Sequence, residues 1–338
     1  MKVGINVPYT DHIPRDMVVA YVQQADRLGY DSVWVAEAYG WDAFTMLTQL
    51  ACATQRIQLG TGIVNVFSRS PALLAQSAAS LDSISGGRFK LGLGTSGHQV
   101  ISGWHGVPFE RGVRRMRETV EIVRMVLRRE RVRYEGEIFK LDMGLKLLTH
   151  PVRESIPIYL ATLTPAGIAL AGEIADGWMP VFFSPEHWRT TLRPQLEKGA
   201  SRASRSLEQV SVCVFQPVVV TEDRQAGRHA TRPHIALYVG GMGSRERNYY
   251  NQLFHRYGFE QEAARIQDLY LERRKDEAIA AVTDEMVDLV TVIGPAAECK
   301  ERLRELEKAG VDELALAITV PGNDPGEMLA ALEALAPG

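Results

Sequence analysis

The strongest constraint on the fold of this chain is a junction that recurs along it. The end of a helical stretch is followed by a turn with Gly or Asp and then by a short apolar run, in ADRLGYDSVWVAE (25–37), LDSISGGRFKLGLG (81–94), AGEIADGWMP (171–180) and LEKAGVDELALAI (306–318). Strands that alternate with helices predict a parallel sheet, because parallel strands need a crossover connection. The remainder of each unit diverges, so a repeat array is not expected.

Eight strands are expected in total, near 3–7, 32–36, 57–66, 88–94, 157–161, 177–181, 210–220 and 313–318. Eight strands that are each followed by a helix predict an α/β fold of the (β/α)8 TIM-barrel type, and 338 residues fit one such barrel. Two segments interrupt the pattern, a hairpin region near 131–150 and a helical insertion near 222–293. No proline-rich linker divides the chain, so residues 1–338 are predicted to form a single domain.

Composition excludes several classes of protein. The 38 Lys and Arg residues and the 41 Asp and Glu residues give a net charge of −3, which does not favour nucleic-acid binding. The three cysteines are widely spaced and odd in number, so a disulfide framework is not predicted. The eight histidines form no H-x-x-x-H or H-x-H pair, so no metal site is predicted. No run of 18 apolar residues and no signal-peptide core is present, so a cytoplasmic protein without a membrane span is expected.

Functional residues are expected at the carboxyl ends of the barrel strands. After the fourth strand, Gly92, Gly94 and Gly97 satisfy the pattern G-x-G-x-x-G. A dinucleotide-binding fold is disfavoured, because this motif does not follow the first strand and Glu118 and Glu121 lie within a helical pattern. The pattern instead predicts a tight loop after this strand.

Two segments are candidates for binding a phosphate. The loop that contains Thr95 and Ser96 offers backbone N–H groups and hydroxyls, although a plain tight loop is the alternative. After the fifth strand, Thr164 is expected to cap a helix that begins at Pro165, which leaves free N–H groups of the first turn at the barrel mouth.

The sequence alone allows more than one role for the residues at three further places. Gly60 and Gly62 alternate within the third strand, which fits either close approach of a ligand or barrel packing. Glu37 lies at the end of the second strand, where it is either an acid or base or a partner in a rim salt bridge. His98 follows the loop of the fourth strand, where a lone histidine is more often structural than catalytic.

Several motifs together resemble one family. The segment GTGIVNVFSRSPALLAQSAASLDSISGGRFKLGLGTSG (60–97) resembles the luciferase-like superfamily in its branch of coenzyme F420-dependent oxidoreductases. WVAEAYGWDAFTML (34–47), GWHGVPFERGVRRMRETVEIVR (103–124) and AGEIADGWMP (171–180) fit the same branch, which includes methylenetetrahydromethanopterin reductases. The resemblance implies a TIM barrel with insertions, usually a homodimer, that transfers a hydride between coenzyme F420 and a small organic substrate.

The resemblance also implies a set of cofactor-binding residues. A cis peptide bond at Gly62-Ile63 is expected behind the deazaflavin ring, with Asn65 nearby, and Glu37 matches an acidic position beside the ring. The positions matched to the phosphate and ribityl chain are Thr95, Ser96, Gly97, Thr162, Leu163 and Thr164. Some relatives carry an Asp-His pair where this chain has Glu37-Ala38, so a dehydrogenase mechanism that uses that histidine is in doubt. His98 is then the candidate for proton transfer.

Two other functions compete with this interpretation. An FMN-dependent monooxygenase has the same fold, and a catalytically idle barrel could serve as a ligand-binding or assembly protein. The substrate pocket is expected to include Trp41, Trp104 and part of the insertion 222–293, which favours an apolar or aromatic compound.

Overall fold

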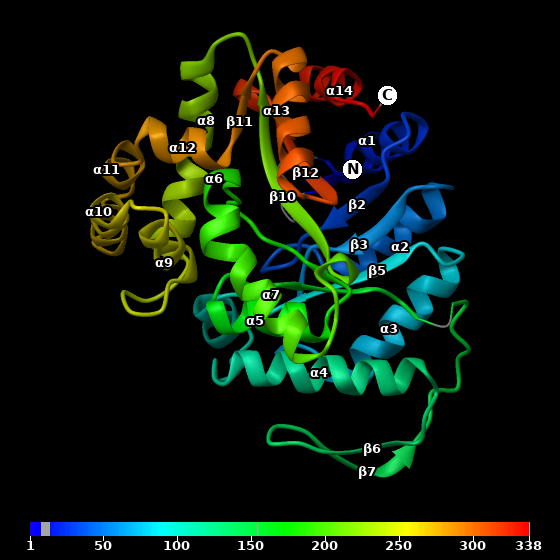
Figure 1. Cartoon of the computed structure of the whole chain (residues 1–338). Helices are drawn as coiled ribbons and strands as arrows, with labels where there is room; N and C mark the ends of the chain where they lie inside the picture. The colour runs from blue at the N-terminus through cyan, green and yellow to red at the C-terminus, as the bar shows by residue number, and fades with distance from the viewer. Residues whose placement is uncertain (8–13, 154, 338) are drawn as a thin grey trace.

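Eight parallel strands close into a barrel in the computed structural model, which describes residues 1–7, 14–153 and 155–337 (Figure 1). The strands are β1 (Lys2–Val7), β2 (Ser32–Val35), β3 (Gln58–Thr61), β5 (Phe89–Gly94), β8 (Ile158–Ala161), β9 (Gly177–Trp178), β10 (Ser211–Val220) and β12 (Glu313–Thr319). Each strand pairs with the next, and β12 pairs back with β1 through Lys2 and Glu313, so the predicted TIM barrel is confirmed. The strand expected at 57–66 is divided, because a second piece, β4 (Val64–Asn65), follows an interruption.

Helices surround the barrel and connect its strands. They are α1 (Arg15–Arg27), α2 (Ala43–Ala53), α3 (Pro71–Ile84), α4 (Gly112–Leu127), α5 (Pro165–Ile174), α6 (Pro185–His187), α7 (Arg193–Arg202), α13 (Ala296–Ala309) and α14 (Pro325–Ala334). Shorter helical turns are η1 (Gln99–Trp104), η2 (Trp188–Leu192), η3 (Leu207–Gln209), η4 (Leu237–Gly241) and η5 (Pro321–Asn323). The expected cap is present at Thr164, whose side chain accepts a hydrogen bond from the N–H of Gly167.

The two predicted interruptions are present. The hairpin pairs β6 (Val132–Glu135) with β7 (Lys140–Leu145) and extends away from the barrel beside α4 (Figure 1). The insertion holds α8 (Arg224–Ala236), α9 (Tyr249–Arg256), α10 (Glu260–Leu271), α11 (Lys275–Ala280) and α12 (Asp284–Val290). The predicted helical character is confirmed, and the sequence did not indicate the short strand β11 (Val292–Gly294) at its end, which pairs with β10. This pairing is possible because β9 covers only Ser211 and Val212 of that edge.

The amino end of the barrel interior holds a buried ion pair. The Lys90 ammonium lies 2.8 Å from both carboxylate oxygens of Glu313, and Ser32 Oγ donates to the same carboxylate at 2.7 Å. The rings of Trp34 and Tyr159 lie 5.4 and 5.5 Å from the ammonium nitrogen, which gives it cation–π contacts. The interior therefore has a charged layer that is covered by aromatic side chains on the side of the barrel mouth.

Candidate active site

The chain makes a bulge between β3 and β4. β3 pairs with β5 through Leu59 and Gly60, and β4 resumes pairing with β5 at Leu93 and Gly94. Between the two, the peptide bond Gly62-Ile63 is cis, as predicted. The hydroxyl of Thr61 fills the missing rung of the ladder, because it accepts from the N–H of Gly92 and donates to the carbonyl of Gly92, both at 2.8 Å.

The two glycines of this strand are explained by close packing inside the barrel. A Cβ atom on Gly60 would overlap the indole of Trp34, and one on Gly62 would lie 2.6 Å from Cζ of Phe215. The side chain of Ile63 packs against the same interior aromatic cluster. Of the two interpretations left open by the sequence, packing of small residues against large ones is therefore sufficient for Gly60 and Gly62.

Strand register brings three candidate segments together at the mouth. Asn65 pairs with Gly94, and Gly94 pairs with Ala161 on the other side. The residues that follow these strand ends, 95–97 and 162–164, must therefore lie beside the bulge at one sector of the rim. Segments 32 to 67 residues apart in sequence thus meet, because β4, β5 and β8 are neighbours in the barrel.

The loop 95–97 has a backbone shape that suits an anion. Ser96 has a φ of 58°, in the left-handed region that non-glycine residues rarely adopt. Such turns direct successive N–H groups into one concave face. The next residues contact the insertion, since Nε2 of Gln99 donates to the carbonyl of Gly241 at 3.0 Å. The insertion therefore packs against the residues that follow the loop, and its contribution to the substrate pocket stays a prediction.

Two side chains from other elements hold the segment 162–164 by donating hydrogen bonds to its backbone carbonyls. Nε1 of Trp178 donates to the carbonyl of Thr162 at 2.9 Å, and Nη2 of Arg256 on α9 donates to the carbonyl of Leu163 at 2.7 Å. Sequence reasoning missed Arg256, because no local signal relates it to a strand end 93 residues away.

Comparison with known proteins gives the family. The luciferase-like monooxygenase family matches residues 1–313. The chain belongs to this family. It is 37% identical to a protein of Mycobacterium tuberculosis named provisionally as a coenzyme F420-dependent oxidoreductase, over 98% of this chain and 99% of that protein. It is 32% identical to the 5,10-methylenetetrahydromethanopterin reductase of Archaeoglobus fulgidus, over 87% of each chain.

One solved structure has the same fold as this chain over nearly its full length. The coenzyme F420-dependent tetrahydromethanopterin reductase from Methanopyrus kandleri superposes with a TM-score of 0.83 at 25% identity and covers 98% of both chains. The family resemblance inferred from residues 60–97 is confirmed by these comparisons.

In this member of the luciferase-like family, Glu37 lies in a salt bridge at the rim. Its two carboxylate oxygens accept from Nη1 and Nη2 of Arg69 at 2.6 and 2.8 Å, and one also accepts from the N–H of Ala43 at 2.9 Å. The side chains of Glu37 and Arg69 are only 8% and 15% exposed. Arg69 belongs to the S-R-S-P motif, whose position in the sequence gave no indication of this partner.

Asp42 completes the rim network. It pairs with the same guanidinium and caps α2 by accepting from the N–H of Thr45. Burial disfavours the charge on Asp42, but the hydrogen bonds from Thr45 and the Arg69 guanidinium lower the pKa of this carboxyl overall. Burial likewise opposes the charge on Arg69, and the carboxylates of Glu37 and Asp42 raise its pKa. The network therefore fixes the loop after β4 to the start of α2.

His98 lies in an aromatic part of the mouth of this luciferase-like barrel. Its exposed ring makes an edge contact with Phe109 at 6.2 Å between centroids. Phe109 also contacts Phe67 at 5.4 Å and Tyr249 of the insertion at 6.5 Å. Within the described ranges His98 has no carboxylate within 4.0 Å that would orient it for proton transfer. Its role in proton transfer stays a prediction.

The two tryptophans expected in the substrate pocket differ in exposure. Trp41 is partly buried against the main core, whereas Trp104 is 66% exposed at the end of η1. Among the residues that the structure describes, no three His, Cys, Asp or Glu side chains are grouped to hold a metal ion. No helix in that part of the chain is long and apolar enough to cross a membrane.

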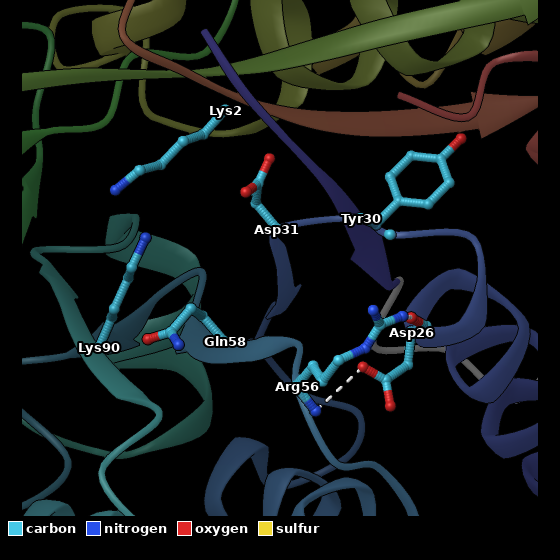
Figure 2. A pocket seen from close by; sticks show the side chains of 8 residues that line it. Lys2, Asp26, Tyr30, Asp31, Arg56, Gln58 and Lys90 are labelled. Carbon is cyan, nitrogen blue, oxygen red and sulfur yellow. Dashed lines mark hydrogen bonds between the residues drawn. The ribbon is translucent and has the colours of Figure 1, made fainter. Parts of the chain in front are cut away.

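A cavity of about 480 Å³ opens at the amino ends of the strands, opposite the mouth (Figure 2). Its two carboxylates and Lys90 are already used by the fold. Asp26 accepts from the N–H groups of Gln55, Arg56 and Ile57, Asp31 accepts from the N–H of Val3, and Lys90 pairs with Glu313. In a TIM barrel this end contributes to stability rather than to chemistry, so the cavity is not the active site.

Proposed function

We propose that this protein is an oxidoreductase that transfers a hydride between coenzyme F420 and a small organic substrate. The observation that carries the proposal is the meeting of the bulge, the loop 95–97 and the segment 162–164 at one sector of the barrel mouth. These are the positions at which the family resemblance implies the deazaflavin, its ribityl chain and its phosphate. Relatives of nearly the same length that are named for coenzyme F420 support this cofactor.

The residues at the mouth fit such a cofactor because two buried donors there have no protein partner. Oδ1 of Asn65 accepts from the N–H groups of Phe67 and Ser68, which leaves Nδ2 as the free donor of this amide. Nδ2 of Asn65 and Nη1 of Arg256 are both buried, and neither has a hydrogen-bond partner among the described residues. Buried donors are normally satisfied, so a bound ligand with acceptor atoms is the natural partner of both.

When bound, coenzyme F420 supplies the two-electron chemistry at C5 of its deazaflavin, while the protein binds and orients it. The bulge at Gly62-Ile63 would support the ring, and Asn65 would supply a hydrogen-bond donor to it. The loop 95–97 and the segment 162–164 would hold the ribityl chain and the phosphate. The pair of Glu37 and Arg69 holds the loop after β4 in place, so Glu37 acts by positioning in this proposal and not by moving a proton.

Titration of the purified protein with coenzyme F420 and with FMN tests the proposal, with quenching of each fluorophore as the signal. We expect binding of F420 in the micromolar range or tighter, and much weaker binding of FMN. Tight binding of FMN without F420 would favour the FMN-dependent monooxygenase. Absence of binding to either would favour the idle barrel.

Ser96→Asp is expected to lower the affinity for F420 at least tenfold. The new carboxylate would oppose the cofactor phosphate at a partly buried site, where charge repulsion reaches a few kcal/mol at most. Asp tolerates the left-handed φ of this position, so the backbone stays unstrained. Ser96→Asn is the matched control, because it has the same shape without the charge. Equal affinities of the two variants would show that the loop does not contact the phosphate.

Glu37→Gln is expected to weaken F420 binding several-fold and to leave kcat at saturating F420 close to that of the wild type. Gln removes the charge that Arg69 pairs with, so the loop after β4 loosens, whereas the chemical step keeps its groups. Steady-state kinetics and fluorescence titration separate the two parameters. A general acid or base typically contributes 10²–10⁴ in rate, so a large fall in kcat with normal F420 affinity would identify proton transfer by Glu37 instead.

The substrate class and the assembly are also proposals. The aromatic wall of Phe67, Phe109 and Tyr249 favours an apolar or aromatic substrate. A homodimer is supported by large apolar side chains left exposed on one protomer, which include Leu73 and Ile84 on α3. Light scattering coupled to size exclusion should give twice the chain mass. A single domain that spans residues 1–338 and a cytoplasmic location stay predictions.

A further inference from the structure

Arg256 of the insertion reaches the barrel mouth with one terminal nitrogen bonded and the other without a partner among the described residues. Arg256 ends α9 and sends its side chain across to the end of β8, where Nη2 bonds to the carbonyl of Leu163. Nε donates to the carbonyl of Gln252 within its own helix at 3.3 Å. The other terminal nitrogen, Nη1, is buried and has no partner in the part of the chain that the structure describes.

No acidic group neutralises this guanidinium. Within the described ranges no carboxylate lies within 4.0 Å of Arg256, whereas Arg69, Arg117 and Arg228 all pair with carboxylates. Burial lowers the pKa of Arg256, which shows that the protein alone disfavours its charge. Arg256 is half-buried, and a cation that is partly removed from water without a counter-charge is stabilised when a ligand supplies one.

The surroundings of Nη1 indicate which ligand this is. The two terminal nitrogens of a guanidinium share one carbon, so Nη1 also lies beside the segment 162–164. That segment leads into α5, whose start carries the positive end of the helix dipole, while the N–H of Gly167 is already bonded to Thr164. A guanidinium and a helix start that converge on one place suit a phosphate.

We propose that Arg256 of the insertion binds the phosphate of the cofactor and supplies its counter-charge. The inference rests on the proposed function and extends it, because it makes the insertion a part of the cofactor site. A bare barrel would then lack the guanidinium that hydrogen-bonds to the segment 162–164.

The test compares cofactors with and without the phosphate. Wild type, Arg256→Met and Arg256→Lys are titrated by fluorescence with F420 and with the deazaflavin that carries the ribityl chain but no phosphate. We expect Arg256→Met to lose at least tenfold in F420 affinity and less than twofold for the phosphate-free compound, with Arg256→Lys between the two. Arg265→Met is the matched control, because it removes an exposed charge of the same insertion and should change neither affinity.

The outcomes separate this inference from the proposed function. Equal losses for both compounds would show that Arg256 only positions Leu163, and no loss for either would show that it is not a ligand; both results overturn the inference. If the wild type binds FMN and not F420, the proposed function fails, and FMN with riboflavin provides the same phosphate comparison for Arg256. If it binds none of the four compounds, both proposals fail. Thermal melting of each variant confirms that the fold is retained.

Discussion

Glu313→Gln is expected to lower the free energy of unfolding by about 3–5 kcal/mol, because it leaves the Lys90 ammonium buried without its counter-charge. Lys90 and Glu313 have side chains only 8% and 1% exposed, so water from the cavity beside Lys90 replaces the lost partner only in small part. Chemical denaturation should show a lower midpoint with an unchanged slope.

Two further variants make this prediction specific. Lys90→Met combined with Glu313→Gln removes both charges and keeps an acceptor for Ser32, so it should be more stable than Glu313→Gln alone. Glu307→Gln breaks the half-exposed pair with the N-terminal amine and should cost only about 0–1 kcal/mol. A double variant no more stable than the single one would show that charge burial is not the cause.

Thr61→Val is expected to destabilise the protein by about 2–6 kcal/mol, because a buried polar group that loses its partner costs about 1–3 kcal/mol and two groups of Gly92 lose theirs. Thr61 is fully buried, so no water reaches these groups. Cofactor affinity should also fall, since the bulge that follows Thr61 is held to β5 by this hydroxyl. Denaturant unfolding and F420 titration measure the two effects.

Thr61→Ser is the control for this prediction. It keeps the hydroxyl and loses only a methyl group, so both hydrogen bonds to Gly92 should remain and the loss of stability should be clearly smaller. If Thr61→Ser and Thr61→Val were equally destabilised, packing of the methyl group and not hydrogen bonding would be the role of this side chain.

The barrel could be predicted from sequence because each strand is a local apolar run next to a helix with a clear start. The helix at Pro165 is an example, since Thr164 and Pro165 mark it within two residues. The sequence predicted one strand over 57–66, whereas the structure divides it into β3 and β4 at the bulge. The division could not be predicted because it depends on how the chain pairs with β5, which is distant in sequence. Likewise β11 was missed, since its partner edge on β10 is free only where β9 has ended.

The candidate site was predictable only where its residues follow strand ends. Thr95, Ser96 and Thr164 were singled out in this way, and the register brings their segments together. The partners that determine what these residues can do come from distant positions. Arg69 meets Glu37 across 32 residues and Arg256 meets Leu163 across 93, and neither distance leaves a periodic or local signal in the sequence.

Besides the aromatic contacts of Phe109 and Phe182, two hydrogen bonds that attach the insertion to the barrel join a side chain on one partner to a backbone carbonyl on the other. Gln99 bonds to the carbonyl of Gly241, and Arg256 bonds to the carbonyl of Leu163. Every amino acid has a carbonyl, so these contacts tolerate mutation at the accepting position and not at the donating one. Directed evolution of the substrate range can therefore exchange the buried Leu163 for other apolar residues and keep its hydrogen bond, whereas libraries that vary Gln99 or Arg256 would lose one of the two hydrogen bonds.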